Sequence, residues 1–144
     1  MNRLPAFLLA AATLTALEKT VKMADLPPAV QKAVQEQTQG ATLQGISKEK
    51  ENGKTQYEVE TVSNGLTRDM MIDASGAVTS VEQEVKLDSL PAPAKAAIEK
   101  RAGSGKIVKV ETVTKGQSVT YEAAVKKGLK TSEFSVNADG SPAR

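Results

Sequence analysis

The sequence predicts an α+β protein made of two α-β-β-β(-β) repeats, which form an antiparallel sheet with both helices on one face and the other face open. Three observations predict this class: an internal repeat, two short helical segments that follow prolines, and apolar residues that alternate between turn signals. A shift of 64 residues places Leu26 on Leu90, Pro27 on Pro91, Ala33 on Ala97, Tyr57 on Tyr121, Glu58 on Glu122 and Gly76 on Gly140. A unit of about 60 residues buries only about 60% of its unfolded surface, so we expect the two copies to share a sheet or a core.

Each repeat begins with a short helix. Asp25 is the expected N-cap in the first copy, and Ser89 is the expected N-cap in the second. Prolines follow both residues within the first turn, where their missing N–H is tolerated. Because an isolated helix of about a dozen residues is marginal in water, each helix is expected to cover another part of the protein.

Strands follow each helix. The turn signals between them include Asn52-Gly53, Asn64-Gly65, Lys115-Gly116 and Lys127-Gly128. Between the turns the residues alternate, so that Tyr57 and Val59 point inward and are joined by Met70 and Ile72 of the next strand. We interpret Tyr57 and Tyr121 as core residues rather than symmetric ligand contacts. The pattern gives a sheet of about seven strands.

Residues 1–17 have the pattern of an export signal, with Arg3 in a short positive segment and an uncharged apolar run from Leu4 to Leu17. The run is shorter than the roughly 20 residues of a membrane-spanning helix. The alternative interpretation is a short apolar helix packed on the domain. We expect a periplasmic or secreted protein without a stable membrane anchor after processing, organised as a signal peptide (1–17), a linker (18–24) and repeats over 25–86 and 87–144.

The composition excludes most common catalytic designs. The chain contains no cysteine and no histidine, which excludes a zinc finger, a thiolate nucleophile and a Ser-His-Asp triad. Carboxylate pairs, serine with lysine, and tyrosine remain, but no nucleophile motif accompanies them, so we do not expect an enzyme. The net charge is only +2, and no exposed aromatic residues interleave with the basic ones, so we expect no nucleic-acid partner.

Each copy combines a Leu-Pro pair before a helix, a strand with Tyr-Glu at its centre and a turn that ends in glycine. In the first copy these are Leu26-Pro27, Tyr57-Glu58-Val59 and Asp73-Ala74-Ser75-Gly76. The combination resembles the tandem PepSY-like domains of exported bacterial proteins, whose fold is similar to that of the β-lactamase inhibitory proteins, and the resemblance covers residues 25–142. It implies export and the binding or restraint of proteins such as peptidases, without catalytic residues. The inhibitors display aromatic residues on the open face, whereas Tyr57, Tyr121 and Phe134 fall on the inner side here, so tight inhibition of a β-lactamase is not expected.

The predicted function is therefore a non-catalytic exported module that engages a protein or peptide of the cell envelope through the open face and its hairpin tips. The resemblance implies an inhibitory or regulatory action on a peptidase. The candidate binding residues, each in a role of polar contact, are Glu58, Glu60, Asp69, Glu122, Lys126 and Lys130. No catalytic residue, metal ligand or cofactor is predicted.

The alternative function is a small-ligand or hard-cation binding protein, with calcium as the cation. The turns 73–76 and 137–140 offer oxygen ligands and a glycine, but they lack the distal carboxylate of a calcium loop, so we interpret them as plain β-turns. Glu58 and Glu60 would be a carboxylate pair for acid and base chemistry, yet alternate positions on a strand place them on the solvated face.

Charge is distributed unevenly between the two copies. Residues 25–86 contain ten acidic and six basic residues, a net charge of −4, and residues 87–144 contain six acidic and ten basic residues, a net charge of +4. Lys126, Lys127 and Lys130 surround the Gly128 turn. This asymmetry would orient the chain on a bipolar partner or let copies associate weakly head to tail; ordinary variation of surface charge is the alternative.

Overall fold

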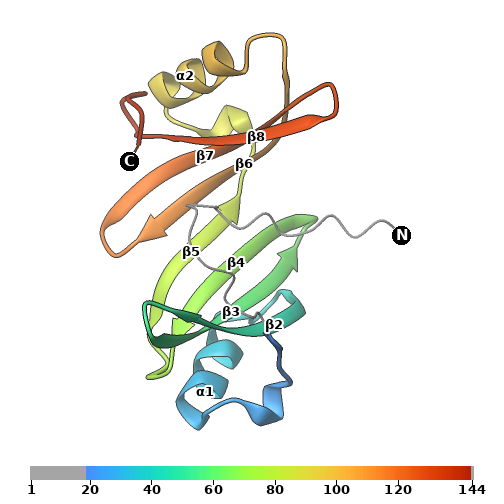
Figure 1. Cartoon of the computed structure of the whole chain (residues 1–144), viewed down its shortest axis with the longest axis vertical. Coiled ribbons are helices and arrows are strands. Elements are labelled where there is room, and N and C mark those ends of the chain that lie inside the picture. Colours follow the sequence, from blue (N-terminus) through green and yellow to red (C-terminus); the bar gives the residue numbers. More distant parts are fainter. Residues whose placement is uncertain (1–18, 144) are drawn as a thin grey trace.

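The structure, a computed structural model, describes residues 19–143, in which an eight-stranded antiparallel sheet carries two α-helices (Figure 1). The strands are β1 (Lys19–Thr20), β2 (Thr42–Glu51), β3 (Lys54–Ser63), β4 (Leu66–Asp73), β5 (Val78–Glu84), β6 (Lys106–Lys115), β7 (Ser118–Lys127) and β8 (Lys130–Val136). The helices are α1 (Pro28–Gln37) and α2 (Ala92–Ala102), and they follow the 3-10 turns η1 (Met23–Asp25) and η2 (Leu87–Ser89). Each strand pairs with its neighbours in the chain. The expected signal peptide lies outside the described residues, and none of the helices within them is both long and apolar enough to span a bilayer.

The order and spacing of the elements recur in the two halves. β6, β7 and β8 begin 64 residues after β2, β3 and β4. The turns after β4 and β8 also approach the two helices in the same way. A Cβ atom on Gly76, at φ +87°, would lie 2.6 Å from the carbonyl oxygen of Ala29, and one on Gly140, at φ +84°, would lie 2.7 Å from that of Pro93. Both contacts are too short for any side chain, so glycine is required at these two equivalent turns.

The helices begin later than the sequence predicted. Asp25 and Ser89 end the two 3-10 turns, and the N-cap positions are Pro27 and Pro91, neither of which makes a side-chain cap hydrogen bond. A residue before proline is driven into the extended region, and Leu26 has φ −78° and ψ 152°. The Leu-Pro step therefore separates each 3-10 turn from its helix, and the predicted N-caps are wrong.

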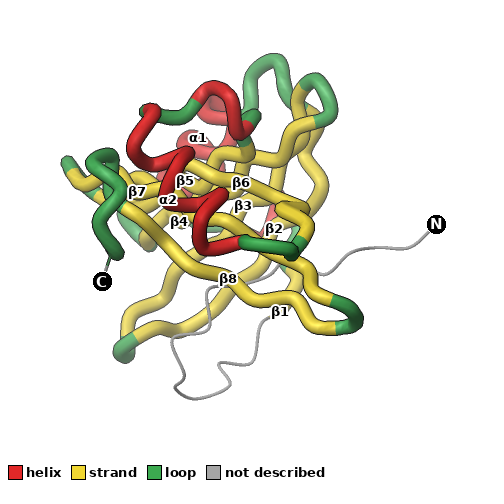
Figure 2. The backbone as a smooth tube through the Cα atoms, turned by 90° about the horizontal axis from the view of Figure 1, so that it is seen from above, coloured by secondary structure: helices red, strands yellow, loops and turns green. Residues whose placement is uncertain are grey.

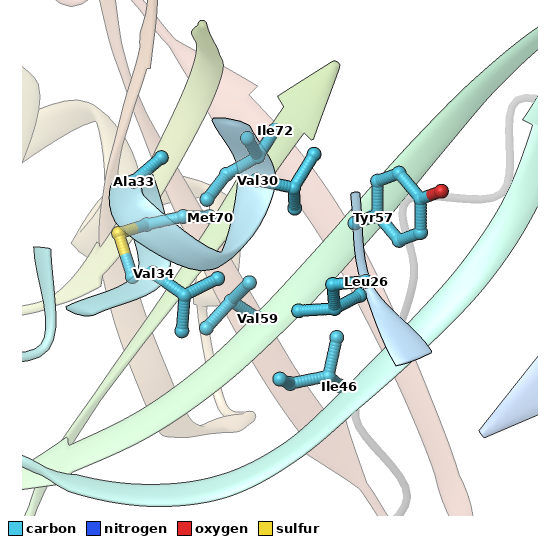
Figure 3. Packing of buried hydrophobic residues seen from close by; sticks show 9 residues of the cluster. All are labelled: Leu26, Val30, Ala33, Val34, Ile46, Tyr57, Val59, Met70 and Ile72. Carbon is cyan, nitrogen blue, oxygen red and sulfur yellow. The ribbon is translucent and has the colours of Figure 1, made fainter. Parts of the chain in front are cut away.

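The apolar residues form two separate cores. The first packs α1 against β2, β3 and β4, and it comprises Leu26, Val30, Ala33, Val34, Ile46, Tyr57, Val59, Met70 and Ile72 (Figure 3). The second packs α2 against β6, β7 and β8, and it comprises Leu90, Ala94, Ile98, Ala102, Val110, Ala123, Val125, Phe134 and Val136. Tyr57 is buried in the first core, as predicted, and Tyr121 is partly buried and packs against the second core.

A row of polar side chains separates the two cores on the helix-bearing face. The register pairs Arg68 of β4 with Gln83 of β5, and Gln83 with Thr112 of β6. The guanidinium of Arg68 donates to the backbone oxygen of Gln37 at 3.2 Å. Polar side chains that need hydrogen bonds thus occupy the middle of this face, and the apolar residues of the two units do not meet. The two units share a sheet, as predicted, but not a core.

Both helices lie on the same face of the sheet, as Figure 2 shows from above. The register carries the inward phase across the strands, because Val59 pairs with Met70, Met70 with Val81, and Val81 with Thr114. Thr114 has the phase of Val110, which belongs to the second core. Neither helix covers the opposite face, which we call the open face. The predicted α+β class, with an antiparallel sheet and helices on one face, is confirmed.

Candidate functional site

Six carboxylates lie side by side on the open face, in two rows that cross the middle of the sheet. They are Glu60, Asp69, Glu82, Glu84, Glu111 and Glu122, and we call them the acidic rows. In the first row Asp69 of β4 lies between Glu60 of β3 and Glu82 of β5. In the second row Glu111 of β6 lies between Glu84 of β5 and Glu122 of β7. Neighbouring strands are about 4.8 Å apart, so each row spans about 10 Å.

This arrangement destabilises the sheet. Carboxylates directly opposite each other on adjacent antiparallel strands repel, because their Cβ atoms are only about 5 Å apart. The apolar residues of the helix-bearing face already fix the register, so neutral side chains in these rows would serve the fold equally well. A local feature that costs stability without serving the fold is typical of a functional site.

Lys109 of β6 compensates part of this charge. Its Nζ lies 2.5 Å from Oε1 of Glu111, and Glu111 is only 7% exposed. Lys109 is therefore the cationic partner of this buried oxygen. Among the ion pairs recorded between described residues, this is the one that involves an acidic row.

The pKa values of several open-face carboxylates are raised. Burial raises the pKa of Asp69 from 3.8 to about 6. The nearby charge of Lys109 partly opposes this shift, and the carboxylates of Glu60, Glu111 and Glu82 add to it. Burial also raises the pKa of Glu82, of Glu122 and of the adjacent Glu133. These shifts show that the open face is short of positive charge and of solvent.

Burial alone would lower the pKa of Lys109. Three carboxylates outweigh that effect, and the pKa is raised by the contact with Glu111 and by the charges of Asp69 and Glu84. Lys109 therefore stays an ammonium ion at neutral pH, and it is already engaged with the second row.

Hydroxyl and backbone donors hold two members of the second row in place. The backbone N–H and the hydroxyl of Thr67 both donate to Oε2 of Glu84 at 3.1 Å. The hydroxyl of Ser135 donates to Oε2 of Glu122 at 3.1 Å. These bonds orient the carboxylates without neutralising them, so the row keeps its charge.

The structure places the predicted binding residues in two regions. Four carboxylates lie on the open face: Glu58, Glu60, Asp69 and Glu122. The two lysines lie at the exposed β7–β8 hairpin, where Lys126 pairs with Thr131 and has the phase of the open face, while Lys130 pairs with Lys127 and has the other phase. The hairpin therefore does not bring both lysines to the carboxylates.

Sequence reasoning missed Glu82, Glu84, Glu111, Glu133 and Lys109. The alternate spacing that singled out Glu58 and Glu60 also occurs at Glu82 and Glu84 and at Lys109 and Glu111. The pairing of β5 with β6, which brings the carboxylates of the two halves together, could not be predicted from the sequence. The acidic side of the molecule is consequently drawn from both halves, and not from the first copy alone.

The turns that offered oxygen ligands use those oxygens internally. Oδ1 of Asp73 accepts hydrogen bonds from the backbone N–H of Ser75 at 2.8 Å and of Ala77 at 3.1 Å. Oδ1 of Asp139 accepts from the backbone N–H and hydroxyl of Ser141. The hydroxyl of Ser75 also donates to Oδ1 of Asp73, at 2.5 Å. The serine hydroxyls, together with the backbone N–H groups, lower the pKa of both aspartates. The segments are turns closed by their own side chains, as predicted, and no group of three or more acidic residues among 19–143 is arranged to hold a metal ion.

Two hollows of the surface lie away from the acidic rows. One, of about 350 Å³, is lined by Lys19, Lys48 and Tyr57 at the β1 edge. The other, of about 300 Å³, lies beside the end of α1 and is lined by Gln37 and Arg68. Neither hollow is lined by more than one carboxylate. The open face is therefore the stronger candidate site.

Residues 29–82 match the PepSY family, described as the peptidase propeptide and YPEB domain. This match covers α1 and strands β2 to β5, and it leaves out the second half of the chain. No curated protein matches the chain.

Several solved structures share the fold of both halves. A putative periplasmic protein from Bacteroides eggerthii is 18% identical, with a TM-score of 0.67 over 83% of this chain and 86% of the other. A BLIP-like protein from Bacteroides fragilis is 18% identical, with a TM-score of 0.61 over 83% and 84%. A DUF2874 family protein from Bacteroides ovatus is 16% identical, with a TM-score of 0.64 over 83% and 85%. The chain therefore has a PepSY-like fold of the BLIP-like kind.

Proposed function

We propose that this chain is a non-catalytic, exported binding module that engages a protein or peptide of the cell envelope through the open face of its sheet. The observation that carries the proposal is the pair of acidic rows, whose opposed carboxylates cost stability on a face that neither helix covers. A binding partner on this face would supply both the missing cover and the missing charge.

The comparisons support export and protein binding. One structural neighbour is described as a periplasmic protein and another as BLIP-like, and residues 1–17 have the pattern of a secretory signal. The description of the matching family as a peptidase propeptide supports a regulatory role toward a peptidase. Open-face carboxylates serve as polar contacts in this role, and no nucleophile is required.

Site-specific photocrosslinking tests the proposal. A photoreactive residue would replace Met71, which lies on the open face between Glu58 and Ser80 in the register. The matched control would carry the same residue at Lys32, an exposed position on α1. We expect a crosslink to a defined envelope protein from position 71 and none from position 32. Crosslinks from position 32 alone, or from neither position, would overturn the proposal.

A further inference from the structure

We infer that the occupant of the open face is an extended polypeptide segment of the partner with lysine or arginine at alternate positions, bound across the acidic rows. The inference rests on the proposed function and names the chemistry of its partner.

Charge complementarity is the first argument. The acidic rows contain six carboxylates, and Lys109 is paired with one of them, Glu111. The remaining carboxylates repel one another across the strands, so a cationic side chain placed between two of them would relieve that repulsion. An anionic or purely apolar occupant would leave the repulsion in place.

The shortage of cations at the rows is the second argument. Nζ of Lys109 contacts the buried Oε1 of Glu111 at 2.5 Å, and the same ammonium also interacts with the charges of Asp69 and Glu84. One compact ammonium therefore serves carboxylates of both rows and does not contact all of them at once. A guanidinium carries several N–H donors in a planar fork and can reach two neighbouring carboxylates at once, which an ammonium on a fixed strand cannot do.

The spacing of the rows favours an extended segment. β5 contributes Glu82 to the first row and Glu84 to the second, two residues apart along the strand. Side chains at i and i+2 of an extended peptide are also about 6.8 Å apart and point the same way. A segment that runs along β5 with basic residues at alternate positions therefore places one of them on each row.

A metal ion and a second copy of the chain fit less well. The described residues contain no group of three acidic side chains arranged around one point. The basic hairpin of another copy is cationic, but Lys126 and Lys127 are adjacent on β7 and point to opposite faces. Only one of these two lysines can face the acidic rows of another copy. The experiment therefore includes a check for self-association through this hairpin.

The raised pKa of Asp69, about 6, supports an additional expectation. A carboxylate binds a cation in its ionised form, so affinity for a basic segment is expected to fall as the pH drops through about 6. The charged groups that face Asp69 are Lys109, Glu60, Glu82 and Glu111. Lys109 remains an ammonium ion throughout this pH range, because its pKa is raised.

The experiment measures binding of a short peptide, in which arginine alternates with serine, to the full chain by isothermal titration. The control peptide has the same sequence with citrulline, which is uncharged and has nearly the same shape. We expect the arginine peptide to bind, the citrulline peptide not to bind, and the affinity to fall at least about tenfold when salt is raised from about 50 to about 500 mM.

Two double variants assign the site. Glu82→Gln/Glu84→Gln removes one charge from each row and keeps an acceptor for Thr67, and it is expected to weaken peptide binding at least about tenfold. Glu36→Gln/Glu99→Gln removes the same charge from exposed helix positions, and it is expected to change affinity less than about twofold. Circular dichroism checks that both variants are folded.

The outcomes separate the inference from the proposed function. Equal loss in both variants, binding of the citrulline peptide, or no binding at all overturns the inference. Concentration-dependent self-association that the Glu82→Gln/Glu84→Gln variant abolishes, without peptide binding, overturns it in favour of a second copy. If the crosslink from position 71 persists in that variant, the open face still binds a partner, but a partner that is not cationic.

Discussion

Replacement of Asp69 by asparagine is expected to stabilise the protein at neutral pH. Asp69 lies in the first acidic row between Glu60 and Glu82. Burial and the neighbouring carboxylates make its ionised form unfavourable in the folded state. Asparagine has the same shape without the charge, so the variant resembles the protonated aspartate and avoids this cost.

The magnitude follows from the pKa. Folding raises the pKa of Asp69 from 3.8 to about 6, and a difference of roughly two pKa units corresponds to about 3 kcal/mol. The gain is therefore expected to reach at most about 3 kcal/mol above pH 7, where the aspartate is ionised in both the folded and the unfolded state. Asp69 is only partly buried, so solvent screening reduces this value. Part of it is also shared with the other carboxylates of the rows, so the measured gain is smaller than about 3 kcal/mol.

The gain depends on pH in a defined direction. Between about pH 4 and pH 6 the folded state binds more protons at Asp69 than the unfolded state, so wild-type stability falls as the pH rises through this window. Below about pH 4 the aspartate is protonated in both states, and the difference from asparagine shrinks below about 1 kcal/mol. Asp73 and Asp139, whose pKa values are lowered, act in the opposite direction and lose their stabilising effect as the pH falls toward those values.

Urea unfolding of the wild type and the variant at about pH 7.5 and about pH 4 measures the gain in stability and its dependence on pH. The control is Glu36→Gln, which removes an exposed carboxylate from α1 and is expected to shift stability by less than about 0.5 kcal/mol. An Asp69→Asn variant that is destabilised at pH 7.5, or whose gain is the same at both pH values, would refute the reasoning.

Three further predictions concern the fold. Gly140→Ala is expected to lower the free energy of unfolding by about 1–3 kcal/mol in urea titrations, because φ is +84° and the new Cβ would meet the oxygen of Pro93; an unchanged midpoint would contradict the close approach. Ile72→Val and Ile98→Val lie in separate cores, so each is expected to cost about 0.5–1.5 kcal/mol and the double variant their sum within about 0.5 kcal/mol; a larger deviation in the same titration would indicate a shared core. Ser89→Ala is expected to lower the free energy of unfolding by less than about 1 kcal/mol in the same titrations, since Ser89 does not cap α2 and its exposed hydroxyl donates only to the backbone oxygen of Lys86; a larger loss would contradict this expectation.

The local order of elements could be predicted from the sequence because it depends on short-range chemistry. Turn dipeptides such as Asn52-Gly53 require positive φ, and both residues have it, at 50° and 77°. Alternation likewise predicted that Met70 and Ile72 would be buried. The helix starts were missed because a residue before proline cannot join a helix easily, and this preference overrides the capping tendency of Asp25.

The candidate site could be predicted only in part. Glu60 and Asp69 were singled out, and they are cross-strand neighbours on strands joined by the tight turn at Asn64-Gly65. A tight turn fixes the register of the two strands that it joins, so this pair follows from local sequence. Lys109 was harder to place, because the register shifts between Ile107 and Lys109. A bulge of this kind changes which face the following side chains occupy.

The sequence by itself determined the repeat, the run of strands and the inward phase of β3, β4, β7 and β8, because turn chemistry and alternation act within a few residues. The tertiary structure decided that β5 pairs with β6, which sets Glu84 beside Glu111 and joins the two halves into one acidic face. The whole of α2 lies between these two strands. No turn rule fixes the register across such a connection, so packing of the helices on the opposite face determines which carboxylates meet.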